Sequence, residues 1–168
     1  MKKQLISIFI VLVLALSLST SAFAAAPQYK STESFVKMMD ENQYEYEFFE
    51  REESGDDEMI ITDFEGDYLD NIEITAFFPD TEDEVFLYSF DVIKFDKADY
   101  SKVLEAVNQF NYDNYYGSLF VDKNDNTVSA VWSVLLGEKD AKEIADIAFH
   151  TFLTVVDDSY ESLKSLGK

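Results

Sequence analysis

Hydrophobic residues recur along this chain with two different periods. In some segments apolar and polar side chains alternate, as they do in a half-buried strand. In others an apolar residue returns every three or four positions, as on one face of a helix; Tyr100, Val103, Leu104 and Val107 are an example. The pattern predicts strands at about 44–48, 59–64, 71–78, 85–92, 118–122 and 127–136, and helices at about 32–42, 100–111 and 139–166.

The order of these elements is α-β-β-β-β-α-β-β-α. Strands that follow one another through short turns pair antiparallel, and the intervening helices then cover the sheet. The sequence therefore predicts a single α+β domain over residues 31–168, with an antiparallel sheet of five to six strands and three helices. Ser31 is expected to cap the first helix, because serine is a favoured N-cap residue.

The first 26 residues have a different pattern. Lys2 and Lys3 precede an apolar run of about 14 residues, which ends before Ala22-Phe23-Ala24. This is the layout of a secretory signal peptide, and the run is short of the roughly 20 residues that span a bilayer. We expect a signal peptide at 1–24, with cleavage after Ala24 or Ala26, and a short tether at 25–30. The mature protein is expected to be secreted or extracytoplasmic, without stable membrane association.

The net charge of the chain excludes one class of partner. The chain has 13 Lys and Arg against 34 Asp and Glu, a formal net charge of −21. Loss of Lys2 and Lys3 with the signal peptide changes this to −23. Such a surface repels phosphates, so nucleic acid is excluded as a partner. The chain has 15 Phe and 10 Tyr, many of them interleaved with the acids, which is not the composition of a disordered acidic tail.

The stretch "VDKNDNTV", residues 121–128, resembles a calcium loop because Asp122, Asn124 and Asn126 alternate. An EF-hand needs Gly at its sixth position and Glu at its twelfth. Counting from Asp122, these positions hold Thr127 and Ser133. The flanks are also predicted strands, so we interpret the stretch as a hairpin turn and assign no metal site.

The sequence offers little for catalysis. A nucleophile–histidine system needs a base and a zinc site normally needs several His or Cys ligands, but the chain has a single His, His150, and no Cys. No glycine-rich phosphate loop is present. The acidic residues cluster in turns, although so many carboxylates leave a glycosidase-like pair open. We assign no catalytic residues and no cofactor.

Several strands carry large apolar residues on both faces, whereas a sheet covered on one side alternates cleanly. If the registers align, the second face holds Phe49, Phe77, Val85 and Leu87. These four residues are candidates for a partner-binding or dimer surface. The alternative is that they belong to the core.

Residues 103–136, "VLEAVNQFNYDNYYGSLFVDKNDNTVSAVWSVLL", show a helix that ends in the spaced pair Asn108 and Asn111, then a strand with Leu119 and Val121, a polar turn and a second strand. Together with the long last helix, this resembles the YbjN family of sensory-transduction regulators, whose fold is similar to that of type III secretion chaperones. The resemblance implies a non-enzymatic binding module, often dimeric, with no catalytic residues. Such chaperones work in the cytoplasm, so the expected export puts a delivery role in doubt.

The sequence thus favours an exported, acidic, chaperone-like or regulatory module that holds a protein or peptide, with a homodimer also open. Two alternatives remain at this point. One is an exported hydrolase with a carboxylate pair, and the other is an extracellular cation-binding protein.

Overall fold

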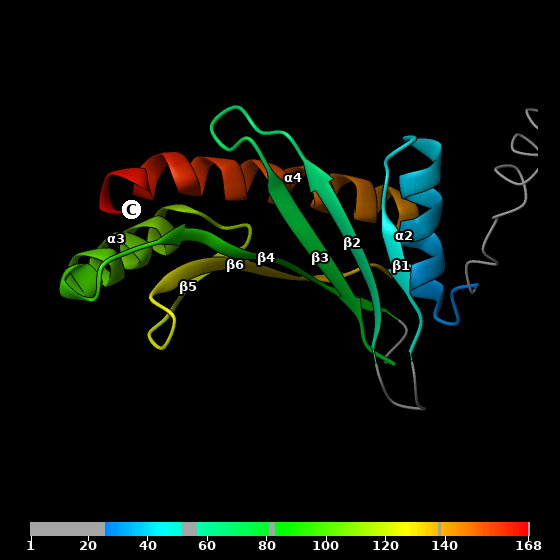
Figure 1. Ribbon diagram of the computed structural model, residues 1–168. Coiled ribbons are helices and arrows are strands. Elements are labelled where there is room, and N and C mark those ends of the chain that lie inside the picture. The colour runs from blue at the N-terminus through cyan, green and yellow to red at the C-terminus, as the bar shows by residue number, and fades with distance from the viewer. Residues whose placement is uncertain (1–25, 52–56, 81–82, 138, 168) are drawn as a thin grey trace, which may run out of the picture.

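The computed structural model describes residues 26–51, 57–80, 83–137 and 139–167 (Figure 1). The predicted signal peptide, 1–24, and the first tether residue lie outside this part. The helices are α2 (Lys30–Glu41), α3 (Tyr100–Asp113) and α4 (Ala141–Leu163). The strands are β1 (Glu47–Phe49), β2 (Glu58–Phe64), β3 (Ile72–Phe78), β4 (Glu84–Lys94), β5 (Ser118–Asp122) and β6 (Thr127–Leu135). Short 3-10 helices, η1 (Lys97–Asp99) and η2 (Lys164–Leu166), precede α3 and follow α4.

The six strands form one antiparallel sheet in the order β1-β2-β3-β4-β6-β5. The predicted fold class and the α-β-β-β-β-α-β-β-α order are therefore confirmed. Neighbours in sequence are neighbours in the sheet except at its centre, where β4 pairs with β6 rather than β5. That pairing joins an N-terminal meander, β1 to β4, to the β5–β6 hairpin.

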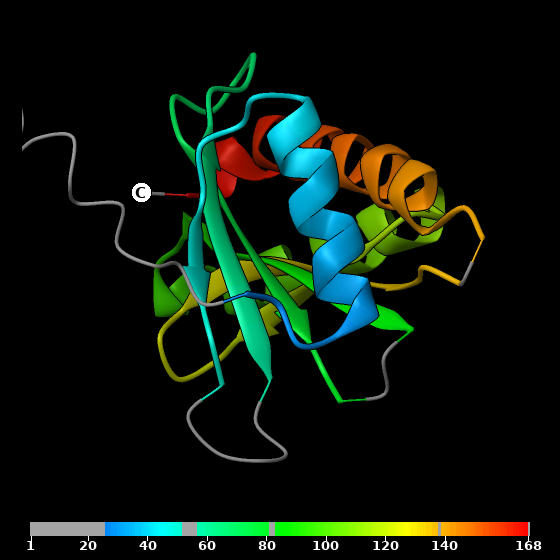
Figure 2. The same ribbon diagram turned by 90° about the vertical axis from the view of Figure 1, so that its right-hand side faces the viewer.

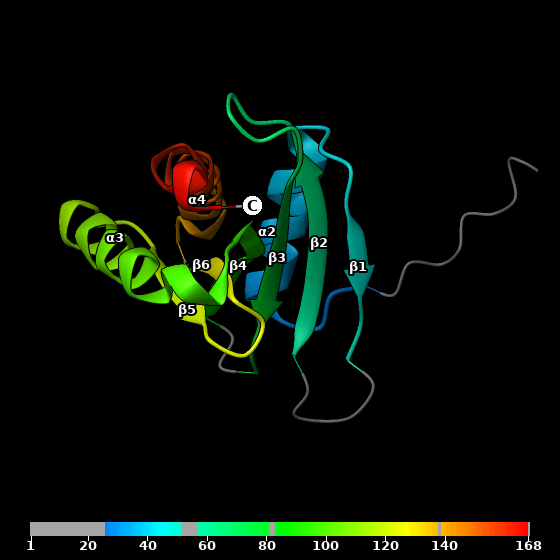
Figure 3. The same ribbon diagram turned by 60° about the vertical axis from the view of Figure 1, so that its left-hand side comes forward.

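The helices lie on one side of the sheet (Figures 1 and 3). The long α4 packs against β3, β4 and β6, while α2 packs against α4 and α3 packs against β5 and α4. Figure 2 shows α2 and α4 side by side in front of the strands. Among the described residues, no helix is both long and apolar enough to cross a bilayer.

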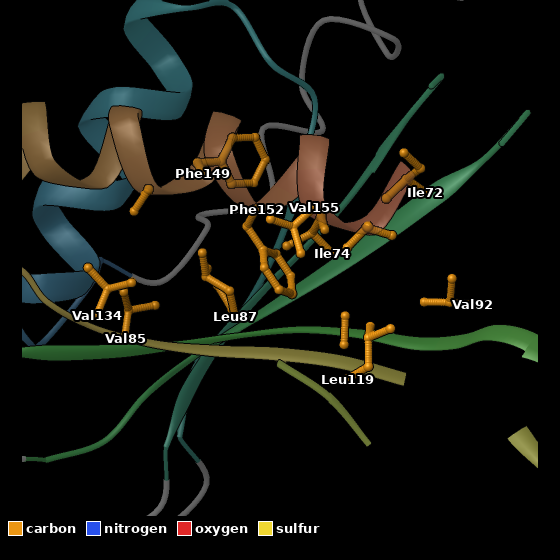
Figure 4. Packing of buried hydrophobic residues seen from close by; sticks show 14 of the residues in the cluster. Ile72, Ile74, Val85, Leu87, Val92, Leu119, Val134, Phe149, Phe152 and Val155 are labelled. Atoms are coloured by element: carbon orange, nitrogen blue, oxygen red, sulfur yellow. The ribbon is translucent and has the colours of Figure 1, made fainter. Parts of the chain in front are cut away.

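The core fills the space between the sheet and α4 (Figure 4). Alternation along β3 turns Ile72, Ile74, Ala76 and Phe78 toward the helices, and all four are buried. The fully buried ring of Phe35, from α2, meets Phe78 and Phe149 edge-on, with centroids 5.3 and 5.7 Å away. Such edge-to-face pairs add to the burial energy of the rings.

The start of α2 differs from the prediction. Tyr29 occupies the N-cap position and Ser31 lies inside the helix, so the expectation that Ser31 caps it is wrong. No side chain caps the first turn, but the buried Glu58 carboxylate of β2 accepts hydrogen bonds from the backbone N–H groups just before the helix, those of Gln28 (2.7 Å) and Tyr29 (3.3 Å). This contact ties the residues before α2 to the sheet.

A second buried carboxylate fixes the loop between β2 and β3. Asp157, on α4, accepts hydrogen bonds from the backbone N–H groups of Asp67 (2.8 Å), Tyr68 (3.1 Å) and Leu69 (2.9 Å). The loop approaches so closely that a side chain at Gly66 would collide with the Asp157 carboxylate. The sheet and its covering helix are therefore joined by charge-assisted hydrogen bonds as well as by apolar packing.

A bulge interrupts β4. Ser89 lies opposite Ala130 and Ile93 opposite Val128, so β4 carries two more residues than β6 over this span. Within the bulge Asp91 has a φ of 55°, and its backbone N–H donates to Ser129 Oγ at 3.1 Å. Bulges re-aim side chains and increase twist, and here Val92 and Ile93 are both buried although they are consecutive.

Candidate functional site

The side of the sheet turned away from the helices carries a row of large apolar side chains. We call this side the open face. Its register pairs Met59 with Phe77 and Phe77 with Phe86, three half-buried residues on β2, β3 and β4. The same alternation adds Phe49, Ile61, Tyr88, Phe90, Phe120, Val131 and Leu135.

The structure separates the four residues that the sequence grouped as a partner surface. Phe49 and Phe77 lie on the open face, where Phe49 is 40% exposed. Val85 and Leu87 lie on the other face, are fully buried and point toward α4 (Figure 4). Their assignment to an exposed surface is wrong, because β4 pairs Phe86, not Val85 or Leu87, with Phe77. On β4 the aromatic residues that lie on the open face are Phe86 and Tyr88, which are half-buried, and Phe90, which is exposed.

Three aromatic side chains of the open face form a corner. The Tyr88 and Phe90 rings are stacked, with centroids 5.3 Å apart and planes 7° apart. The Phe77 ring stands edge-on to Tyr88 at 5.5 Å. A hollow of about 470 Å³ lies here, lined by Phe77, Phe86, Tyr88, Phe90 and Asp57. Half of the Phe90 surface (49%) stays exposed, so the corner presents aromatic surface to an incoming molecule.

Carboxylates frame this aromatic surface. The strand registers put Glu47, Asp63, Glu73, Glu84 and Asp122 on the open face, while Lys94 is the one cation that the strands add there. Asn71 donates to Asp63 and Ser133 donates to Glu84, but these neutral donors leave the charges in place. The open face is therefore apolar and acidic at once.

The residues of the spaced asparagine pair have different roles. The Asn111 side chain donates to the carbonyl of Leu119 at 2.9 Å and accepts from the Leu119 N–H at 2.8 Å, so it fastens α3 to β5. Asn108 is exposed on α3. Leu119 is buried and Val121 is half-buried against the core, both on the helix-covered side. Within this motif, Asn111, Leu119 and Val121 take part in packing.

His150 lies on the exposed side of α4 with two polar neighbours. Its Nε2 is 3.1 Å from the Tyr44 hydroxyl and 3.6 Å from Asp146 Oδ1. Burial raises the pKa of Tyr44, and the nearby Asp146 carboxylate adds to the rise. Asn42 also donates to Asp146, at 3.0 Å. These contacts link the α2–β1 loop to α4. In the described part of the chain, no Ser or Thr hydroxyl is hydrogen-bonded to the His150 ring, and Thr154 donates instead to the His150 backbone carbonyl at 3.1 Å.

The described residues show no enclosed carboxylate pair for a hydrolase and no ligand cluster for a cation-binding protein. Asp63 and Glu73 are opposite each other on β2 and β3 and line a hollow of about 450 Å³ with Glu45 and Glu47, but both carboxylate residues are exposed rather than buried. In the described part of the chain, no group of three or more His, Cys, Asp or Glu residues could hold a metal ion. The stretch "VDKNDNTV" forms the β5–β6 turn, in which Asp122 Oδ1 accepts from the N–H of Asn124 at 2.7 Å and Asn126 has a φ of 56°.

Comparison with known proteins decides the family. The family model described as "YbjN: Putative bacterial sensory transduction regulator" matches residues 32–165. The chain belongs to the YbjN family. The expected resemblance is confirmed, and the description of the family as regulators is consistent with a binding module.

A solved YbjN structure has a similar arrangement of elements. It is described as the crystal structure of YbjN, "a putative transcription regulator from E. coli". The similarity has a TM-score of 0.48 at 10% sequence identity and covers 77% of this chain and 91% of that one. No curated protein matches this sequence.

Sequence reasoning missed Phe86, Tyr88, Phe90 and Asp57 as parts of the candidate site of this YbjN-family chain. The signal was present, because Phe86, Tyr88 and Phe90 share one phase of the alternation along β4. What the sequence could not give was which phase faces the helices, since Val85 and Leu87 are equally apolar.

Proposed function

We propose that this protein is an exported, acidic, non-enzymatic binding module that holds an apolar segment of a protein or peptide on its open face. The observation that carries the proposal is the aromatic corner of Phe77, Tyr88 and Phe90. Its rings lie on the side of the sheet away from α2, α3 and α4. Exposed apolar surface of this kind is typical of interaction sites.

Charge makes such a surface compatible with a stable secreted protein. The formal net charge of −21 opposes association between copies, so aromatic surface can stay exposed without aggregation. Membership of a family described as regulators supports binding rather than turnover. Export is supported by the basic and apolar pattern of residues 1–24 and its small-residue site at Ala22-Phe23-Ala24.

A photo-crosslinking residue at position 90 tests the binding site. We expect light-dependent adducts when it replaces Phe90 and none when it replaces Tyr115, a tyrosine that is 91% exposed on the α3–β5 loop. The captured partner, once purified, should bind Phe90→Ser at least about tenfold more weakly than wild type, since truncating a central aromatic contact costs on the order of 1–2 kcal/mol or more. Equal capture at both positions would contradict the proposal.

Mass spectrometry of the protein recovered from the culture tests export. We expect a chain that begins at Ala25 or Pro27, released after Ala24 or Ala26. A cell-associated chain that begins at Met1 would contradict this part of the proposal and leave the binding site untouched.

A further inference from the structure

We infer that the segment held on the open face is cationic as well as apolar, and that it presents Lys or Arg side chains to the aromatic corner and the carboxylates around it. This inference rests on the proposed function, because it names the chemistry of the partner for the same surface. Charge and ring geometry both point to it.

The charges of the open face are of nearly one sign. Glu47, Asp63, Glu73, Glu84 and Asp122 face the same side as the aromatic row, against Lys94 alone at the far end of β4. The ion pairs found among the described residues use other acids: Glu41, Asp99, Asp146 and Glu161. A cationic partner would therefore meet negative charge that no ion pair of the described residues neutralises, and charge complementarity of this kind favours encounter and specificity.

The rings supply a second attraction for the same charge. An ammonium or guanidinium group above an aromatic face within about 6 Å is stabilised by about 0.5–1 kcal/mol at exposed sites. The Phe90 ring is half exposed and stacked on Tyr88, and the Asp57 carboxylate lines the same hollow. A Lys or Arg side chain could lay its apolar stem on the rings and bring its charge to Asp57.

A second copy of the chain is a poorer occupant. Two open faces placed together would oppose carboxylates to carboxylates, and like charges across an interface cost several kcal/mol. A homodimer through this face would have to bury enough apolar surface to outweigh that repulsion, and it would tighten as salt screens the charges. A cationic segment behaves in the opposite way, since salt weakens its binding.

Three synthetic nonapeptides separate these possibilities. The first repeats lysine, phenylalanine and serine; the second has glutamate in place of lysine; the third keeps lysine but has alanine in place of phenylalanine. Calorimetric titration of the full mature chain should show the first peptide binding at least about tenfold more tightly than the other two, because each of them lacks one of the two attractions. Raising NaCl from 50 to 500 mM should weaken binding of the first peptide severalfold.

Substitutions in the protein test whether the peptide binds at the aromatic corner. We expect Phe90→Ala to lower the affinity for the lysine–phenylalanine peptide about fivefold or more, and Asp57→Asn to lower it about threefold. Tyr115→Ala, which removes a more exposed ring elsewhere, should leave the affinity unchanged. All three positions are exposed, so thermal melting should confirm that each variant folds like the wild type.

The outcomes distinguish the two proposals. If the glutamate peptide binds as tightly as the lysine peptide, and Phe90→Ala weakens both, the face binds apolar segments and the cationic inference fails alone. If no aromatic peptide binds, or Phe90→Ala changes nothing, the proposed function fails too. A salt-tightened dimer that Phe90→Ala dissociates would assign the face to a second copy and overturn the inference.

Discussion

One buried carboxylate, that of Asp157, holds the β2–β3 loop against α4. Its two oxygens accept from three consecutive backbone N–H groups, those of Asp67, Tyr68 and Leu69. Hydrogen bonds to a charged group contribute about 1.5–3 kcal/mol each, so this single side chain anchors three consecutive N–H groups of the loop. Because the loop depends on this one carboxylate, substitution of Asp157 should destabilise the fold far more than substitution of its neighbour.

Asp157→Ala should lower the free energy of unfolding by about 3 kcal/mol, because the N–H groups of the loop lose a charged acceptor. Asp158→Ala is the matched control; Asp158 is exposed, so we expect a change within about 0.5 kcal/mol. Urea unfolding followed by circular dichroism measures both. Equal effects at the two positions would show that the carboxylate does not support the loop.

Tyr46 should make the fold sensitive to alkaline pH. Burial, together with the hydrogen bond to the Asp40 carboxylate, raises its pKa to about 12. In the unfolded chain the phenol ionises near pH 10. The stabilising contribution is therefore complete below pH 10 and is lost as pH rises toward 12, because only the unfolded state releases the proton in that range. Unfolding free energies at pH 9, 10 and 11 should fall more steeply for wild type than for Tyr46→Phe.

At the scale of elements, the asparagine pair shows how a motif fastens a helix to a strand. Asn111 bonds both backbone groups of Leu119, at the start of β5, whereas Asn108 is exposed. We expect Asn111→Ala to lower the free energy of unfolding by about 2 kcal/mol, since two hydrogen bonds of roughly 1 kcal/mol each are lost. Asn108→Ala should change it by less than about 0.5 kcal/mol. Chemical denaturation of the two variants measures the difference, and a similar loss in both would contradict this division of roles.

The elements themselves could be predicted from the sequence, because period and turn residues are local signals. Helix α4 was expected at 139–166 and is found at Ala141–Leu163, followed by η2. Which face of β4 turns toward α4 is not a local property, since Val85 and Leu87 are as apolar as Phe86 and Phe90. That choice depends on how β4 pairs with β3 and with β6. The β6 strand lies more than ten residues further along the chain, so its pairing is not a local signal. The sequence also carries no local pattern that indicates the bulge at Ser89–Ile93. Sequence reasoning therefore identified Phe49 and Phe77 of the open face but not the aromatic residues of β4.

At the scale of the whole molecule, net charge governs both stability and association. A chain at −21 repels itself, and the repulsion destabilises the compact state. The open face concentrates part of this charge beside its aromatic rings. Stability and partner choice are therefore coupled through the same carboxylates, and their neutralisation by a cationic partner would stabilise the fold.

Salt should raise the melting temperature. Between 20 and 500 mM NaCl the screening length falls from about 20 Å to below 5 Å, so repulsion among surface carboxylates weakens, and we expect an increase of several degrees. Glu47→Gln combined with Glu73→Gln removes two open-face charges and should reduce that dependence. Differential scanning calorimetry of both proteins measures it. A melting temperature that falls with salt would show that ion pairs outweigh the repulsion.

The position of α4 after all six strands has a consequence for the order of folding. Phe149 and Phe152, both fully buried, complete the core that α2 and the strands begin, and the central β4–β6 pairing also waits for residues 127–135. A nascent chain therefore cannot close its core until α4 has been synthesised. If the chain is exported as proposed, such late closure would keep it unfolded, and therefore competent for translocation, until α4 has been made.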